Sequence, residues 1–277
     1  MHSYDTPGSV SLQIKLPNGR VVVTTVDQPK TTVDLVSLGR RGRDPSEDIE
    51  VTMDEQGGRH VLRVEQRNNF KWGPIQISWG ADLECRITCP PGTELDLSGA
   101  STDVRVEGDL GEVSARTASG DVRLQNVGGP LRVKTASGDV FVAAVAGEAS
   151  LVTVSGDVSV ERIDTTLTGR TVSGDVTVGT VAGELVLATT SGDVDVKAVV
   201  SGDVRVQTVS GDVRVGIGRG TRAWVDAASV SGALESELGL QDADVEGDAA
   251  AGTVVPLHVK TVSGDVAVVR VAAAISA

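Results

Sequence analysis

Short runs of alternating apolar and polar residues recur along most of the chain. Val122 and Leu124 flank a polar residue, and Val158 and Val160 repeat this pattern further along the chain. An alternation with period two, kept over about five residues, predicts a half-buried β-strand. No segment shows the spacing of an amphipathic helix. We therefore expect an all-β protein built from many short strands.

A tetrapeptide repeat accompanies these runs. The first five copies of Ser-Gly-Asp-Val follow one another at a constant interval, and a weaker turn element, such as Gly183-Glu184-Leu185, falls midway between copies. The repeating unit is thus a nine-residue half, one turn and one strand, doubled to about 18 residues. Copies of Ser-Gly-Asp-Val begin at Ser119, Ser137, Ser155, Ser173, Ser191, Ser201, Ser210 and Ser263, and a degenerate copy begins at Ser231.

This repeat predicts the architecture. A strand of about five residues buries too little apolar surface to be stable alone, so equivalent strands must stack on one another. Parallel stacking at about 4.8 Å per strand gives a solenoid with two facing sheets and about 18 residues per turn. Crossovers between parallel strands are nearly always right-handed. We predict a right-handed parallel β-solenoid.

The chain ends are less regular than the middle. Residues 1–95 are predicted to form an N-terminal β region that caps the solenoid, with a hairpin of residues 48–54 and 59–65 and an insertion that carries Trp72 and Trp79. Residues 96–277 are predicted to form the repeat solenoid, interrupted by an acidic loop at 238–252 and closed by a last rung at 256–271. One continuous domain is expected.

Composition and charge narrow the function. The 48 valines and only six aromatic residues suit a narrow interior between two sheets. A net charge of −13 repels phosphate backbones and anionic lipid surfaces, so we expect neither a nucleic-acid nor a membrane partner. The N-terminus shows no signal-peptide pattern, and no apolar run is long enough for a membrane helix. These features predict a cytoplasmic location.

The repeat also suggests a family. The recurring Thr-[Ala/Val]-Ser-Gly-Asp-Val at Thr117, Thr135, Thr153 and Thr171, together with Pro90-Pro91-Gly92-Thr93-Glu94-Leu95-Asp96-Leu97, resembles the bacterial β-strand-repeat family labelled "putative adhesin", a domain of unknown function. The resemblance covers nearly the whole chain. It implies a parallel β-solenoid, and it supplies no activity and no catalytic residues.

The turn aspartates are the sharpest candidates for chemistry. Stacking places six of them in one column: Asp121, Asp139, Asp157, Asp175, Asp193 and Asp212. Carboxylates about 5 Å apart repel one another by about 0.8 kcal/mol per pair even in water. A divalent cation such as Ca²⁺ would offset this repulsion. Alternatively, Ser and Asp side chains accept hydrogen bonds from turn N–H groups while Gly takes a positive φ, and we favour this structural alternative.

Other chemistry has little support in the sequence. Cys85 and Cys89 lie on one face of a predicted strand, too far apart for a disulfide, and we expect two buried thiols rather than half of a zinc site. The three histidines are scattered, and no nucleophile elbow or phosphate-binding loop occurs. We expect no enzyme activity, no catalytic residue and no cofactor, with a polysaccharide-active β-helix or a surface adhesin as alternatives.

The outer faces offer a binding function instead. We expect a non-enzymatic scaffold or interaction module that docks an unknown protein partner on a flat sheet face, as solenoids often do. Open solenoid ends also allow self-association. The outward columns of the second sheet are predicted to be Arg132, Ser150, Thr168, Val186 and Arg205, and Lys134, Val152, Arg170, Ala188 and Gln207.

Overall fold

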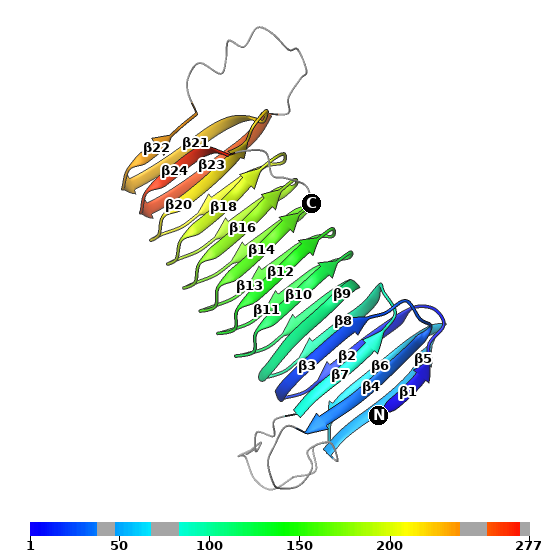
Figure 1. The fold of residues 1–277 in the computed structure, drawn as a ribbon. Helices are drawn as coiled ribbons and strands as arrows, with labels where there is room; N and C mark the ends of the chain where they lie inside the picture. The colour runs from blue at the N-terminus through cyan, green and yellow to red at the C-terminus, as the bar shows by residue number, and fades with distance from the viewer. Residues whose placement is uncertain (38–47, 68–82, 239–253, 272–277) are drawn as a thin grey trace, which may run out of the picture. The chain divides into compact units, whose positions relative to one another are not determined.

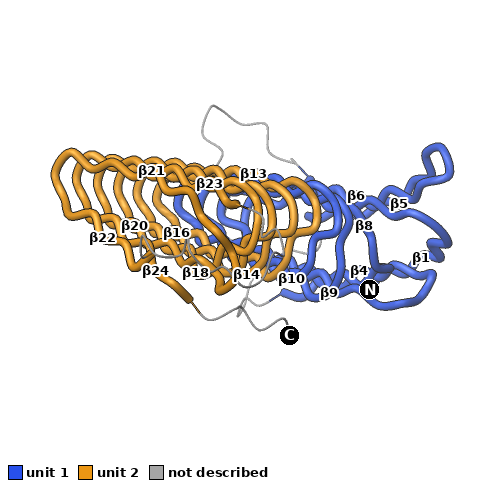
Figure 2. Tube along the Cα trace, turned by 90° about the horizontal axis from the view of Figure 1, so that it is seen from above, with its two compact units in different colours: residues 1–141 blue, residues 142–277 orange. Residues whose placement is uncertain are grey.

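The computed structural model describes residues 1–37, 48–67, 83–238 and 254–271, which form β-strands joined by short turns (Figure 1). No α-helix occurs in these residues, and none of their segments could cross a membrane as a helix. The chain has two compact units, residues 1–141 and 142–277 (Figure 2). Both are built from stacked parallel strands, so the prediction of an all-β solenoid is confirmed.

In the first unit, one sheet combines parallel and antiparallel pairing. Strands β7, β3, β9 and β10 pair in parallel in that order, and β4 and then β1 add to β7 in antiparallel orientation. The two antiparallel strands lie at the end of this pairing order, beyond β7. The bounds are β1 (His2–Asp5), β3 (Asn18–Thr25), β4 (Lys30–Ser37), β7 (Leu83–Cys89), β9 (Ser101–Arg116) and β10 (Val122–Val127).

The second sheet of this unit shares the long strand β9. Strands β6, β2, β8, β9 and β11 pair in parallel, and β5 adds to β6 as the predicted antiparallel hairpin, which is confirmed. Trp72 and Trp79 lie outside the described residues. The bounds are β2 (Val10–Lys15), β5 (Ile49–Gln56), β6 (Arg59–Gln66), β8 (Thr93–Ser98) and β11 (Leu131–Lys134).

The second unit consists of two parallel sheets. One runs β14, β16, β18, β20, β24, β22, and the other runs β13, β15, β17, β19, β23, β21. Val158 pairs with Val176 and Val176 with Val194, which is the interval that the repeat predicts for one turn. The bounds are β13 (Ala149–Val152), β14 (Val158–Ile163), β15 (Thr166–Arg170), β16 (Val176–Val181), β17 (Glu184–Ala188), β18 (Val194–Val199), β19 (Val204–Gln207), β20 (Val213–Gly218), β21 (Arg222–Ser231), β22 (Leu234–Ser236), β23 (Val254–Ser263) and β24 (Val266–Val271). Strand β12 (Val140–Val145) spans the boundary between the units.

The order of the C-terminal rungs corrects one expectation. Strands β23 and β24 are not the last rung, because they lie between β19–β20 and β21–β22. The inward side chains explain this order. On β23, Val255, Leu257 and Val259 are fully buried, whereas β21 offers smaller or polar residues such as Ala227 and Ser229, which stay half-exposed. The more apolar rung takes the position that is covered on both sides.

The core is a stack of small aliphatic side chains. Val160, Val178, Val196 and Val215 occupy equivalent positions on successive strands, and none is exposed to solvent. Burial of each contributes roughly 1.5–3 kcal/mol relative to exposure. The buried hydrophobic residues that the structure describes are all Val, Leu, Ile, Ala or Cys, in keeping with the six aromatic residues of the chain.

The cysteines belong to the same kind of core. Cys85 and Cys89 are free, buried thiols on the inward face of β7, as the alternation predicts. Burial raises the pKa of the Cys85 thiol to about 12, with a smaller contribution from the Asp34 carboxylate. Burial also raises the pKa of the Cys89 thiol to about 11, against the opposing effect of a hydrogen bond with Thr93. Both side chains act as small hydrophobic residues.

Candidate functional site

The turn aspartates of the second unit form a hydrogen-bonded ladder. Each Oδ1 accepts the main-chain N–H of the aspartate in the next rung, at 2.9 Å from Asp175 to Asp157 and from Asp193 to Asp175. The ladder continues at 2.8 Å to Asp212 and from there to Asp265. These bonds confirm that the Asp side chains accept from turn N–H groups.

The first unit contains the same ladder, and the sequence prediction of the column omits two of the ladder's members. Asp103 accepts from the N–H of Asp121 at 3.2 Å, and Asp121 accepts from Asp139 at 3.1 Å. Asp103 lies in Ser-Thr-Asp-Val, one repeat before Asp121, so the spacing could have identified it. Asp265 belongs to the last Ser-Gly-Asp-Val copy, and only the rung order places it beside Asp212.

These bonds bear on the calcium hypothesis. Main-chain N–H donors favour the ionised carboxylate and therefore offset part of the repulsion along the column. Within the described ranges, no group of three or more His, Cys, Asp or Glu residues could hold a metal ion. Calcium binding by the column stays a prediction.

Two separate reasons favour glycine in these motifs, and the first applies to only some of the copies. Gly192, Gly211 and Gly264 have φ of +140°, +143° and +153°, as predicted for the turn, whereas Gly120, Gly138 and Gly174 do not adopt a positive φ, so the prediction is wrong for these copies. At Gly138, where φ is not in this range, an added Cβ would overlap the carbonyl oxygen of Gly120 in the preceding rung. The second reason is close stacking of main chain on main chain, which a single turn does not reveal.

A buried threonine precedes seven of the eight Ser-Gly-Asp-Val copies by two residues, and its hydroxyl is found in one of two states. Thr117, Thr135 and Thr153 each accept the N–H of their own glycine, at 3.0–3.1 Å. Gly174 and Gly192 instead donate to the serine carbonyl of the following rung, at 3.2 and 3.1 Å. The same switch occurs at Gly211 and Gly264, and the corresponding hydroxyls of Thr171, Thr189, Thr208 and Thr261 have no hydrogen-bond partner.

An exposed aromatic residue marks the outer face of the second unit. Trp224 on β21 is 56% exposed, and its ring meets His258 on β23 edge-on, with centroids 5.3 Å apart. His258 Nδ1 lies 3.4 Å from Asp226 Oδ2, and Pro256 is the register partner of Trp224. We call Trp224, Asp226, Pro256 and His258 the Trp224 face.

The Trp224 face continues the predicted outward columns. Ser150, Thr168, Val186 and Arg205 occupy one row across β13, β15, β17 and β19, and His258 follows Arg205 in the same row. The column prediction is confirmed for these residues. Trp224 was not predicted, because it lies outside the regular repeats, on a rung whose place depends on the tertiary structure.

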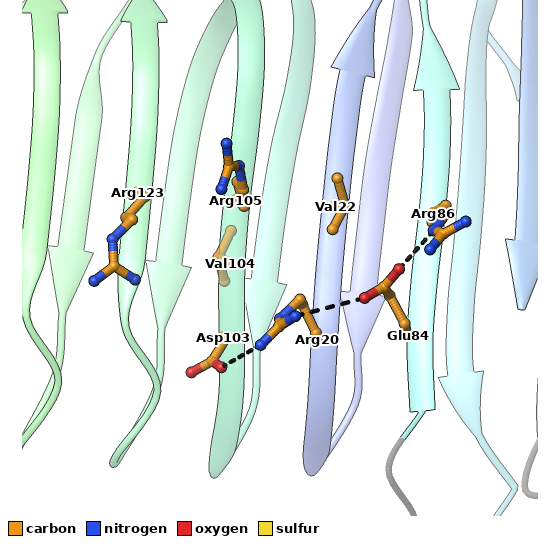
Figure 3. Close-up of a pocket in the computed structure, with 8 residues that line it drawn as sticks. All are labelled: Arg20, Val22, Glu84, Arg86, Asp103, Val104, Arg105 and Arg123. Atoms are coloured by element: carbon orange, nitrogen blue, oxygen red, sulfur yellow. Dashed lines mark hydrogen bonds and ion pairs between the residues drawn. The ribbon is translucent and has the colours of Figure 1, made fainter. Parts of the chain in front are cut away.

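A second candidate is a hollow on the outer face of β7, β3, β9 and β10 in the first unit (Figure 3). Its volume is about 460 Å³, and four arginines line it: Arg20, Arg86, Arg105 and Arg123. Arg20 bridges Glu84 and Asp103 at 3.7 and 3.8 Å, and Glu84 is also bound by Arg86 Nε at 2.5 Å. We call this the arginine hollow. No sequence motif predicted it.

Three solved structures are distantly similar to this chain. A protein from Parabacteroides distasonis described as a "putative lipid binding protein" is 13% identical, with 98% of this chain and 95% of that one covered and a TM-score of 0.44. A "putative adhesin" from Bacteroides fragilis is also 13% identical over the same shares, with a TM-score of 0.37. A "putative cell adhesion protein" from Clostridium sporogenes is 11% identical, covering 95% and 93%, with a TM-score of 0.30.

Curated proteins give no match to this chain. A family model does match, and it spans residues 11–269, from β2 through β24. The match therefore covers both units described above, and the chain belongs to the Toastrack DUF4097 family.

Proposed function

We propose that this protein is a non-catalytic β-solenoid that acts as an interaction module and docks a protein partner on the Trp224 face. The observation that carries the proposal is an aromatic side chain held out to solvent on a rigid sheet, in a chain with only three tryptophans. Tryptophan is enriched among the residues that dominate protein–protein binding energy.

The surroundings of Trp224 favour docking. Its strand, of ten residues, pairs with β23 along its length, and the edge-on contact with His258 restricts the indole ring. Asp226 in turn orients the imidazole. A side chain that is already ordered loses little entropy when a partner covers it, which increases affinity. On the same outer face, the row from Ser150 to Val186 presents small side chains, and it continues through Arg205 and His258 to Asp226.

The reactive groups of the chain support a non-catalytic role. The two thiols are buried and their pKa values are raised to about 12 and 11, so neither supplies a thiolate nucleophile near neutral pH. The column aspartates use one carboxylate oxygen each as an acceptor within the fold. An extended, flat sheet face is how solenoids commonly bind other proteins.

The test is photo-crosslinking in the native host cell. A crosslinking amino acid at Val186, on the row that continues through His258 to Asp226 of the Trp224 face, is compared with one at Val172, an exposed residue on the turn edge. We expect a defined partner protein from position 186 that is absent from position 172 and is lost in Trp224→Ala. The same partner from both positions, or an unchanged yield in Trp224→Ala, would overturn the proposal.

Two further measurements separate the alternatives. Light scattering of the purified chain reports self-association. If the crosslinked species is a second copy of this chain, the partner is this protein itself and not a different protein. Turnover on a glycan panel that is lost on single Asp or Glu substitution would contradict the non-catalytic role. The cytoplasmic location stays a prediction.

A further inference from the structure

Within the arginine hollow, four residues form a row across neighbouring strands. Val22 on β3 is the register partner of Arg86 on β7 and also of Arg105 on β9, and Arg105 is the partner of Arg123 on β10. The strand spacing places the Cα atoms of Arg86 and Arg105 about 9.6 Å apart, with a short apolar side chain between them. Two guanidinium groups thus flank a half-exposed valine floor (Figure 3).

Ion pairs along the strands restrict both guanidinium groups. Arg86 uses its Nε to bind Glu84 Oε1, two residues before it, and Arg105 uses its Nε to bind Glu107 Oε1 at 2.9 Å, two residues after it. These bonds engage Nε, so the terminal NH₂ groups of each fork stay available as donors within the described residues. Glu84 is only 7% exposed, which makes the Arg86 pair the more rigid of the two.

Such forks match acidic ligands. A guanidinium with its terminal nitrogens available donates two parallel hydrogen bonds to a carboxylate or phosphate, and prior ordering reduces the entropy lost on binding. The lining contains four arginines and two carboxylates, Glu84 and Asp103, in a chain whose net charge is −13. The lining itself therefore has two more positive than negative side chains, on a protein that is acidic as a whole.

The neighbouring carboxylates decide the size of the ligand. Glu107 and Asp121 lie just beyond the lining, paired with Arg105 and Arg123. A long polyanion or an anionic membrane would extend over these carboxylates and over the acidic surface beyond, which disfavours both. A volume of about 460 Å³ is in the range of small-molecule sites.

We propose that the arginine hollow binds a small ligand with two acidic groups, carboxylate or phosphate, held between Arg86 and Arg105 with its middle on Val22. The site lies in the first unit and the Trp224 face in the second. The failure of one proposal therefore leaves the other intact.

Calorimetry tests this proposal with pyrophosphate, glutarate and adipate, against acetate at matched ionic strength. We expect saturable binding of pyrophosphate or of a dicarboxylate, and the responding class identifies phosphate or carboxylate as the natural chemistry. In Arg105→Gln, the loss of charged hydrogen bonds is expected to weaken binding about tenfold or more. Arg132→Gln is the matched control, since Arg132 is an exposed arginine paired with Glu112 on the other sheet of the same unit.

A second variant separates recognition by the fork from simple charge attraction. Arg105→Lys keeps the charge and removes the planar fork, so we expect most of the tenfold loss to persist. Circular dichroism confirms that each variant is folded. The proposal is overturned if no probe binds at millimolar concentration, if Arg132→Gln weakens binding as much as Arg105→Gln, or if Arg105→Lys binds like the unchanged protein.

Discussion

Replacing Gly138 by alanine tests whether close stacking between rungs holds the solenoid together. The φ of Gly138 is outside the left-handed range, so alanine brings no main-chain strain of that kind. An ideal Cβ at this position would overlap the carbonyl oxygen of Gly120 and lie 2.6 Å from its carbonyl carbon. Since carbon atoms pack best at about 3.5–4.0 Å, the two rungs must separate locally by about 1 Å.

The cost follows from the bonds that cross this gap. Ser137 N–H donates to Ala118 O at 2.9 Å, and Asp139 N–H donates to Asp121 Oδ1 at 3.1 Å. A separation of about 1 Å breaks both, at about 1 kcal/mol or more each. Overpacking destabilises the folded protein by about 1–3 kcal/mol more. The lower conformational entropy of the unfolded alanine variant stabilises it by about 0.5–1 kcal/mol. We expect a net loss of about 3 kcal/mol.

Urea denaturation followed by circular dichroism measures this loss as a shift of the midpoint at constant slope. The control is Gly128→Ala in the same unit, where the nearest atom to an added Cβ is Leu110 O at 3.6 Å, an ordinary contact. We expect Gly128→Ala to change stability by less than about 1 kcal/mol. Equal midpoints for the two variants would refute the stacking argument.

Three further predictions concern the aspartate column and the thiols. Asp175→Ala removes the acceptor of the Asp193 N–H and should lower the free energy of unfolding by about 1–3 kcal/mol, measured by urea denaturation. Asp175→Asn keeps an acceptor oxygen and should lower it by less. A larger loss in Asp175→Asn than in Asp175→Ala would contradict the ladder. Because the ladder already uses the column carboxylates, millimolar Ca²⁺ should raise the melting temperature no more than Mg²⁺ at equal ionic strength, and a Ca²⁺-specific rise with saturable heat would establish the cation site. The pKa values of Cys85 and Cys89 are raised above the unfolded value of 9.0. Their stabilising effect is therefore complete below pH 9 and declines by about 1.4 kcal/mol per pH unit for each thiol between pH 9 and about 11. Urea midpoints at pH 8 and pH 10 measure this loss of stability, by comparison with a Cys85→Ala, Cys89→Ala double variant. An equal change of midpoint between the two pH values in both proteins would contradict the prediction.

Much of the fold could be predicted because the information is local. The alternation of Val122 and Leu124 specifies a strand with one buried face, and the constant interval of the repeat specifies which strands are neighbours. Both follow from geometry that repeats along the chain. The order of the last rungs was harder to predict from the sequence. It depends on which rung, β21 or β23, has the more apolar inward residues and on which position in the stack is buried on both sides.

The candidate sites were predicted less well. The aspartate column followed from the repeat, but the hydrogen bonds that engage it connect different rungs. The arginine hollow combines Arg20, Arg86, Arg105 and Arg123, which come from four strands, and no motif connects them in the sequence. Trp224 gains its neighbour His258 only because the rung of β23 lies beside that of β21.

The sequence by itself determined the repeat: short strands, a turn with glycine and aspartate, and a narrow core of valine. The tertiary structure decided what each copy of the repeat does. Residues 153–158 and 171–176 both read Thr-Val-Ser-Gly-Asp-Val, yet Gly156 donates to Thr153 Oγ1 while Gly174 donates to the carbonyl oxygen of Ser191. Identical local chemistry reaches two outcomes because the glycine N–H can bond either within its own turn or to the next rung, and the geometry of the stacked rungs decides which of the two acceptors it meets.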